Sequence, residues 1–393
     1  MSASPNPSGT VVHEIRWSDA LPWWLLFRAA ASAFSPTVIV LAALGAVATW
    51  AGWSACNQLG LAGADGFVNV AGPVDGGLVL PDGETAVATP LAPSRGATPW
   101  LHDVVRRLPR PLAELLALVS VPFRPSATST QLLGAAARLG WFVLVWSIFG
   151  TGITRHVALK LVGEEAPGPL GATLFGSRKW LPAFNAALFV LVGILALSVP
   201  GALLGLAMRT ELGLAFAGAV WPLVLLGAVV LAILAIGVVA GWPLMVAAVG
   251  VERGDSFQAI STAFSYLYQR PLHYAFYALV ALAVAVPTVA VASMFADATG
   301  TLAMWAASFG MGHQRTAVVL DGLSGVGDEA SRWGVRAIGF WSRGLAHLLA
   351  SFGWGYFWAI ATAAYMLLRQ DVDGTELDEV VIDEPGGEDP RNG

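Results

Sequence analysis

The sequence is poor in charged residues. Asp, Glu, Lys and Arg make up 12% of its 393 residues, and 56% of the residues are apolar. A soluble domain of this size carries about twice that fraction of charge. Such a shortage indicates that most of the surface faces lipid, which excludes an ordinary cytosolic enzyme and a nucleic-acid-binding protein.

Cysteine and catalytic motifs are also scarce. Cys56 is the only cysteine, so no intramolecular disulfide can form, and a disulfide-stapled secreted domain is excluded. The sequence contains no Gly-x-Ser-x-Gly element, no phosphate-binding P-loop, no His-Glu-x-x-His and no Cys/His metal spacing. We therefore predict no catalytic residue, no metal site and no cofactor, and we expect that the protein is not an enzyme.

Long uncharged runs stand in place of the missing charge. About 20 apolar residues are enough to cross a bilayer as a helix, and six such runs predict an all-α, polytopic transmembrane helical bundle. The predicted spans cover residues 36–56, 132–154, 181–208, 221–250, 272–296 and 345–368. No Asp, Glu, Lys or Arg lies near the centre of a span, and this argues against ion-coupled transport, which usually needs a buried charge.

The fourth run is too long for a simple span. As one helix, residues 212–251 would be about 60 Å long, roughly twice the thickness of the hydrocarbon layer. Two arrangements remain open: one bent span, or a span plus a re-entrant segment. We expect the bend or break between Gly218 and Pro222.

Amphipathic stretches flank the spans. They predict interfacial helices at residues 17–33, 101–121, 170–180, 256–268 and 328–343. The third and fourth of these follow similar elbows, each with a Gly and acids before the helix and with basic residues, aromatic residues and a Pro after it. This similarity indicates either an internal repeat of two helix–elbow–helix units or simply the residue types that any interfacial elbow needs.

The basic residues predict how the chain is oriented. The short connection 155–179 carries four of them and 252–270 carries two, whereas 209–211 on the other side carries one. By the positive-inside rule, the first two connections and both termini face the cytoplasm. We therefore expect a multi-pass protein of the bacterial inner (cytoplasmic) membrane.

These assignments divide the chain into three regions. Residues 1–33 form a cytoplasmic N-terminus with an interfacial helix, and residues 34–369 form the six-span membrane domain. The long outer loop 57–130 has a Gly- and Pro-rich first part, and the pattern leaves open whether the loop is ordered. Residues 370–393 contain nine acidic residues and Arg391, a net charge of −8, and we expect a disordered acidic tail.

Two groups of arginines are candidate contact sites. In the first group the spacings of four and seven residues place the side chains on one helix face, and the second group lies in the outer loop. We expect both to contact lipid phosphates or an acidic partner, with ordinary interfacial anchoring as the alternative. The residues are Arg332, Arg336 and Arg343, and then Arg106, Arg107 and Arg110.

Two Gly-x-x-x-Gly motifs are candidate helix-packing sites, because small residues on one face let helix backbones approach closely. The first motif is formed by Gly201 and Gly205, and the second by Gly237 and Gly241. We predict that they pack spans three and four together inside the monomer, with homodimer contact as the alternative.

Several segments near the span ends resemble a known group of proteins. The segments Gly241–Met245, Asp255–Ala259, Ser265–Tyr274, Tyr365–Arg369 and Asp371–Thr375 resemble a group of uncharacterised bacterial polytopic inner-membrane proteins. More distantly, an acid and a Ser before a small-residue amphipathic helix are similar to the membrane domain of some glycerophosphodiester phosphodiesterases, whose catalytic domain matches no part of this sequence. The resemblance implies the membrane class and assigns no functional residue.

The missing motifs and uncharged span centres favour a non-enzymatic structural or assembly module. Its partners would be membrane lipids and a membrane protein or a second copy of the chain, and no nucleic acid. The alternative is a transporter or permease-like protein that uses backbone carbonyls at broken helices, with Pro200, Pro243 and Pro287 as candidate breaks. A polar cavity between spans three, four and five would favour the transporter, and a closely packed bundle would favour the module.

Overall fold

The structure is a computed structural model that describes residues 21–61, 119, 121, 128–323 and 333–375. Within these ranges the chain forms helices and no strand, which confirms the predicted all-α fold. The helices are α2 (Trp24–Ser32), α3 (Pro36–Gln58), α6 (Ser129–Val162), α7 (Pro169–Ala207), α8 (Glu211–Glu252), α9 (Ser256–Gln269), α10 (Pro271–Leu323) and α11 (Trp333–Asp373).

Five helices are long and apolar enough to cross a membrane: α3, α6, α7, α8 and α10. They contain the first five predicted spans. The sixth predicted span, 345–368, lies within α11, which is not among the five. Its Gly, Trp and Tyr residues lower its mean hydropathy relative to the other helices. By length and composition, the chain is a multi-pass helical membrane protein.

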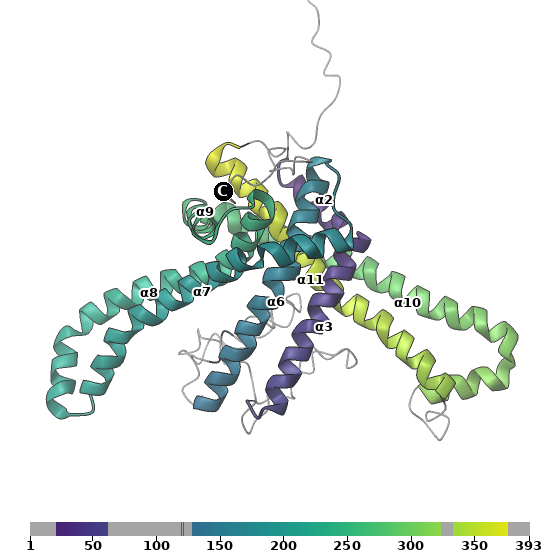
Figure 1. The fold of residues 1–393 in the computed structure, drawn as a ribbon, viewed down its shortest axis with the longest axis horizontal. Coiled ribbons are helices and arrows are strands. Elements are labelled where there is room, and N and C mark those ends of the chain that lie inside the picture. The colour runs from purple at the N-terminus through teal and green to yellow at the C-terminus, as the bar shows by residue number, and fades with distance from the viewer. Residues whose placement is uncertain (1–20, 62–118, 120, 122–127, 324–332, 376–393) are drawn as a thin grey trace, which may run out of the picture.

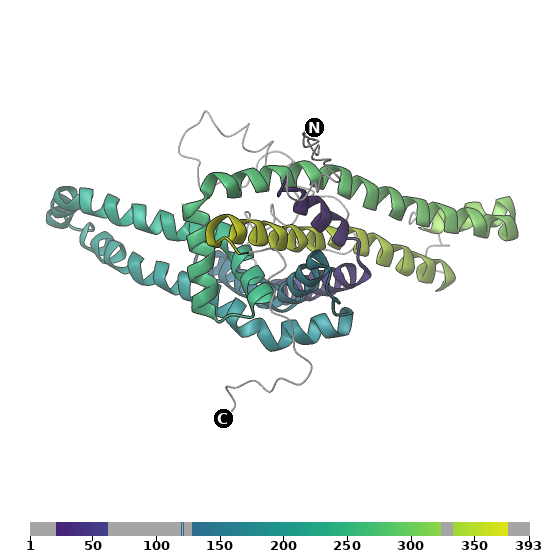
Figure 2. The same cartoon turned by 90° about the horizontal axis from the view of Figure 1, so that it is seen from above.

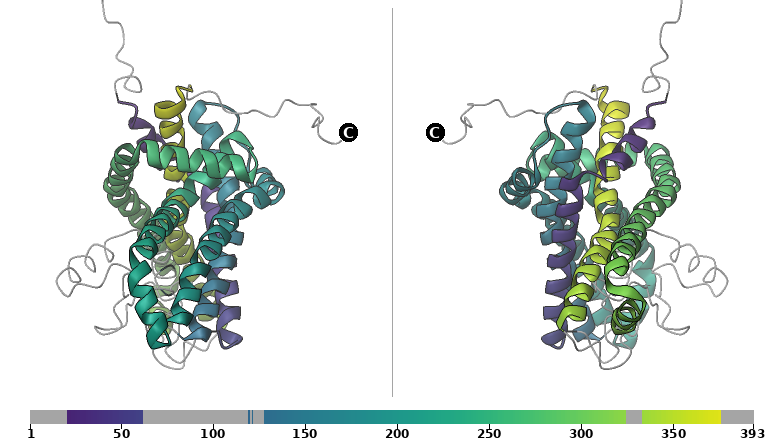
Figure 3. Two further views of the ribbon diagram at one scale, coloured as in Figure 1. Left: turned by 90° about the vertical axis from the view of Figure 1, so that its left-hand side faces the viewer. Right: turned by 90° about the vertical axis from the view of Figure 1, so that its right-hand side faces the viewer.

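The helices meet at one end of the molecule and diverge from it. Figure 1 shows α3 and α6 running down the centre, the α7–α8 hairpin extending to one side and the α10–α11 pair to the other. Seen from above, the two pairs point in opposite directions (Figure 2), and the side views show that all of them descend from the same end (Figure 3). We call this shared end, with α2 and α9, the compact end.

The diverging parts of the two pairs are called the arms. The first arm is residues 191–207 of α7 with 211–240 of α8, and the second is residues 293–323 of α10 with 333–350 of α11. Most residues of both arms are exposed. The exposed side chains of the first arm are almost all apolar, whereas those of the second arm also include charged residues: Asp297, Arg315, Asp321, Arg336 and Arg343. The buried core therefore lies outside the arms.

The core is centred on α6, α11 and the last part of α8. Every residue from Gly241 to Val251 is buried. Tryptophan rings join the three helices: Trp146 stacks on Trp354 with centroids 4.6 Å apart, and Trp242 packs edge-on against Trp358 at 5.4 Å. Offset and edge-on aromatic pairs of this kind stabilise more than their buried area alone.

Small residues let the helix backbones touch at the compact end. A side chain at Gly176 of α7 would overlap the Ile148 carbonyl oxygen of α6, and one at Gly250 of α8 would overlap Thr154 of α6. Gly152 faces the Ala172 carbonyl in the same way. Glycine is thus required where α7 and α8 cross α6.

Local sequence signals set several helix ends. Proline occupies the first position of α3 and α7, where its missing N–H costs nothing. The Thr128 side chain accepts from the Gln131 backbone, and the Gln131 side chain accepts from the Thr128 backbone, a capping box that starts α6. Gly163, with φ 87°, ends the same helix in the left-handed conformation.

The long fourth run resolves into a single helix. α8 is 42 residues long and continues through Pro222 and Pro243, so the run is not broken between residues 218 and 222. Figure 1 shows that the helix instead curves along the first arm. A helical proline removes one backbone hydrogen bond and leaves the rest of the ladder in place. α10 instead changes direction at Gly312, where φ is 71° and ψ is 166°.

The interfacial helices are described in part. The prediction at 256–268 is confirmed as α9, which ends before Pro271. The stretch 170–180 is not a separate helix but the first part of α7, which continues through Pro182. The predicted helix at 17–33 corresponds in part to α2, and the one at 328–343 corresponds in part to the start of α11. Nearly all of the predicted helix at 101–121 lies outside the described residues, as does most of the outer loop.

Helix α11 extends into the first residues of the predicted tail. We expected disorder from residue 370, but α11 continues to Asp373. Its last turn is held by tyrosine hydroxyls, as described below, which is why the helix extends past the apolar segment. Residues 376–393 lie outside the described part of the chain.

Candidate functional site at the compact end

Polar side chains from separate helices gather at the compact end around Glu252, the last residue of α8. The Tyr365 hydroxyl donates to Glu252 Oε1, and Arg369 Nε lies 3.2 Å from the same oxygen. Gln258 Nε2 donates to Glu252 Oε2 at 3.0 Å. We call these four residues the Glu252 cluster; it joins the ends of α8, α9 and α11.

The elbow between α8 and α9 positions this cluster. Arg253 ends α8 in the left-handed conformation with φ 61°, so the chain turns sharply directly after Glu252. Asp255 Oδ1 then accepts from the Gln258 backbone N–H at 2.8 Å and caps the start of α9. The cap fixes the first turn of α9, which is where the Gln258 side chain can return to Glu252.

Two tyrosine–aspartate pairs extend the polar network to α10. The Tyr266 hydroxyl of α9 donates to Asp373, and the Tyr277 hydroxyl of α10 donates to Asp371 Oδ2 at 2.7 Å. Burial, followed by the hydrogen bond to Asp373, raises the pKa of the Tyr266 hydroxyl above its ordinary value. Tyr266 therefore stays protonated and acts as a donor.

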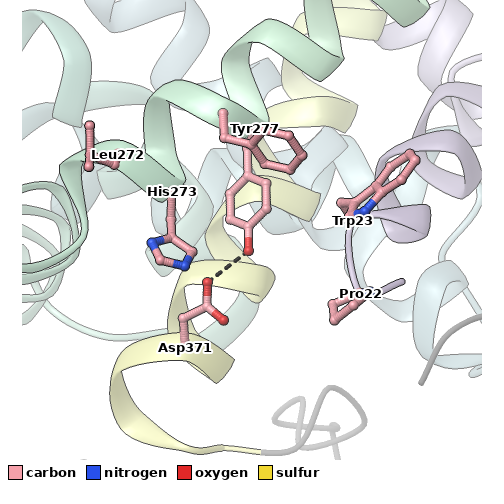
Figure 4. A pocket seen from close by; sticks show the side chains of 7 residues that line it. Pro22, Trp23, Leu272, His273, Tyr277 and Asp371 are labelled. Atoms are coloured by element: carbon pink, nitrogen blue, oxygen red, sulfur yellow. Dashed lines mark hydrogen bonds between the residues drawn. The ribbon is translucent and has the colours of Figure 1, made fainter. Parts of the chain in front are cut away.

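An open groove of about 410 Å³ lies beside the second pair, between the starts of α2 and α10 and the end of α11 (Figure 4). Aromatic side chains form much of its wall: the Trp23 and Phe276 rings meet edge-on at 6.4 Å, and Phe276 and Tyr277 lie 5.9 Å apart. Asp371 is the one acidic residue of the wall. The lining residues are Pro22, Trp23, Leu272, His273, Phe276, Tyr277 and Asp371.

A second groove, of about 400 Å³, lies between the last turns of α3 and the first turns of α6, away from the polar network. Its wall is almost entirely apolar. The lining residues are Ala51, Gly52, Ala55, Cys56, Leu59, Ala137 and Trp141.

A serine–histidine pair is also present at the compact end. His156 Nδ1 lies 2.8 Å from the Pro167 carbonyl oxygen, which can only accept, so Nδ1 carries the proton and Nε2 accepts from the Ser35 hydroxyl at 2.8 Å. Such a pair can activate a nucleophile. However, Ser35 and His156 are only 7% and 6% exposed, and neither lines a described groove. The pair therefore fits a structural link between α3 and α6.

Basic side chains converge on Phe175 near the start of α7. The guanidinium carbon atoms of Arg155 and Arg253 lie 5.3 Å and 5.9 Å from the ring centroid. Lys179 Nζ donates to the Arg253 carbonyl at 3.4 Å. Both cytoplasmic connections predicted from the sequence thus contribute to one basic region.

The predicted arginine sites lie elsewhere. Arg336 and Arg343 are exposed near the start of α11, in the second arm, and are not brought to the compact end. The remaining four predicted arginines lie outside the described residues: Arg332, Arg106, Arg107 and Arg110.

The glycine motifs do not pack spans three and four together as expected. A side chain added at Gly201 or Gly205 would meet no atom of another described helix within 4 Å, because the first arm is open there. Gly237 instead faces the Phe264 ring of α9, and the nearest atom of another helix to Gly241 is the Ala263 Cβ of α9 at 4.0 Å. The second motif serves α8–α9 packing.

The residues of the compact end were missed by motif reasoning, although their positions carried a signal. Glu252 follows the fourth predicted span, Tyr277 lies in the first two turns of the fifth, and Arg369 and Asp371 follow the sixth. Span ends that face the same side of a membrane lie at the same level. The positions of these residues therefore indicate that their side chains can lie close together.

Neither a metal site among the described residues nor a relative of the chain adds to this geometry. Within the described residues, no group of three or more His, Cys, Asp or Glu side chains could hold a metal ion. No family model, curated protein or solved structure matches the chain. The resemblance to bacterial inner-membrane proteins stays a prediction.

Proposed function

We propose that the chain is a non-enzymatic structural or assembly module of a bacterial inner membrane. In this role the compact end holds the helices together, and the arms present apolar faces to lipid and to a membrane protein partner or a second copy. One observation carries the proposal: the most apolar helices are the least buried. Only 6% and 11% of the apolar segments of α8 and α7 are buried, against 44% for α6.

The exposed apolar side chains of the first arm favour contact with lipid or with another protein over contact with water. Leu223, Leu226 and Ile236 of α8 are each more than half exposed. Leaving apolar area in water costs about 25 cal/mol per Å², so the arm favours lipid or another helix around it. Between helices in lipid, association depends on close packing rather than on the hydrophobic effect, which suits a partner of complementary shape.

The transporter alternative has less support. It relies on helices broken at prolines, whereas α7, α8 and α10 continue through Pro200, Pro243 and Pro287. It also relies on a polar cavity between these helices, and the two described grooves lie at other places, with mainly apolar walls.

The proposed orientation places the compact end in the cytoplasm. Basic residues gather there, as the positive-inside rule requires of the cytoplasmic side. In the described chain they are Arg28, Arg155, Lys160, Arg178, Lys179, Arg253, Arg270 and Arg369.

Site-specific photo-crosslinking in native membranes tests the module. A photoreactive residue in place of Leu226, which is 64% exposed, should form adducts with lipid or with a second protein chain. The same residue in place of the fully buried Val246 is the matched control and should crosslink only within the chain.

Thiol labelling distinguishes the transporter. Cys56→Ser removes the only cysteine, and Val229→Cys then places a single thiol in the first arm. A module embedded in lipid leaves this thiol protected from a membrane-impermeant reagent. Rapid labelling in intact membranes would reveal a water-filled path and contradict the proposed function.

A further inference from the structure

The groove of Figure 4 lies at the start of a candidate membrane span. α10 enters its apolar segment directly after Pro271, so Leu272 and His273 mark the end of a candidate span. Aromatic side chains concentrate at this level in membrane proteins. A ligand in the groove would therefore be a molecule whose polar part resides at the membrane surface.

The chemistry of the wall selects a cation. The faces of aromatic rings attract ammonium groups, most strongly for Trp, and Trp23, Phe276 and Tyr277 contribute three rings. Asp371 adds a carboxylate at the edge of the groove. Its Oδ2 accepts from Tyr277, and in Figure 4 the other oxygen points toward the side of the groove formed by Pro22 and Trp23. A headgroup with a net negative charge would be repelled by this carboxylate.

From these features we infer that the groove binds the primary ammonium headgroup of a phospholipid, namely the phosphoethanolamine group. A primary ammonium offers three N–H donors to a carboxylate, whereas a quaternary choline offers none. The inference rests on the proposed function, because it assigns a specific lipid to a protein proposed to contact lipids.

The surroundings suit the rest of the lipid. The volume of about 410 Å³ falls within the roughly 300–1,000 Å³ of small-ligand sites. Below the groove, α10 continues with exposed apolar side chains, including Leu279, against which acyl chains can lie. Arg270, exposed directly before α10, supplies a cation at the same end for the phosphate.

Lipid titration of the purified full-length chain tests the inference. The protein, in a mild detergent, is titrated with phosphatidylethanolamine, phosphatidylcholine and phosphatidylglycerol of identical acyl chains, and bound lipid is counted by native mass spectrometry. We expect phosphatidylethanolamine to bind most tightly. Asp371→Asn keeps the shape and the Tyr277 hydrogen bond but removes the charge, and should weaken this binding about tenfold.

Matched control variants distinguish lipid binding in the groove from general effects of a substitution on the protein. Asp373→Asn changes the carboxylate two residues away, which pairs with Tyr266 and does not line the groove, and should leave binding unchanged. Trp23→Leu should weaken binding severalfold, whereas Trp24→Leu should not, because Trp24 stacks on Phe27 outside the wall. Melting temperatures identify any variant that fails to fold.

Two results would overturn the inference. One is equal binding of the three lipids, and the other is unchanged phosphatidylethanolamine binding in Asp371→Asn. Either would leave crosslinking from position 226 unaffected, so the failure of this site and the failure of the proposed function can be told apart.

Discussion

α8 passes through both regions of the molecule, and its two parts differ in what surrounds them. Residues 211–240 form an exposed side of the first arm, whereas residues 241–251 are entirely buried in the compact end. Both parts are apolar, so composition does not explain the difference. The neighbours of the two parts do: Gly250 crosses α6 directly at Thr154, whereas side chains added at Gly218 and Gly227 of the arm would meet no atom of another described helix within 4 Å. Whether a part of α8 is buried therefore depends on whether its small residues contact another helix.

The largest expected effect comes from filling one such crossing. Gly176→Leu drives a side chain into the Ile148 carbonyl of α6, and overpacking of this kind costs about 3 kcal/mol of stability or prevents folding. Gly201→Leu in the arm meets open space and should leave stability unchanged or slightly raised, since Leu is the better helix former. Melting curves in detergent compare the two; equal losses would refute the distinction between the regions.

A smaller effect is expected from the two ends of α8. Glu252→Gln removes the charge that pairs with Arg369 and should cost about 1–2 kcal/mol, a figure reduced by the relief of a negative charge at a helix C-terminus. Glu211→Gln at the exposed first turn should cost about 0.5 kcal/mol. Chemical unfolding in one detergent measures both, and a larger loss for Glu211→Gln would contradict the proposed role of the Glu252 cluster.

The smallest effect concerns alkaline pH. Folding raises the pKa of Tyr266, so the folded chain holds this proton more tightly than the unfolded chain. The resulting stability is complete below the ordinary tyrosine pKa of about 10 and is lost as the pH rises toward the folded value. Tyr266→Phe should therefore show a shallower decline in melting temperature above pH of about 10, and parallel curves would exclude Tyr266 as a contributor.

Local signals in the sequence predicted much of the fold. Pro36 and Pro271 marked helix starts, and Asp255 followed by a small-residue amphipathic stretch marked α9. Each of these features depends only on residues within about one helical turn of one another. The sequence alone is therefore enough to predict where these helices begin. The apolar runs likewise predicted six spans, and five of these lie in helices that are long and apolar enough to cross a membrane.

The site required information that lies beyond local sequence. Glu252 and Tyr365 are 113 residues apart, and their meeting depends on how α8 and α11 cross. The Gly201 motif was misread for the same reason: a row of small residues shows that a close approach is allowed, not which helix makes it. Asp371 was assigned to a solvated tail because its partner, Tyr277, lies 94 residues away.

Pro243 stands where α8 leaves the compact end, and its position affects how the first arm responds to the bilayer. Proline lacks the N–H that would bond the carbonyl of Val239, so the helix bends most easily at this point. Membranes differ by several ångströms in hydrocarbon thickness, and helices adapt mainly by tilting. An arm that bends at Pro243 can match a thicker or thinner membrane while the contacts of Glu252 stay fixed.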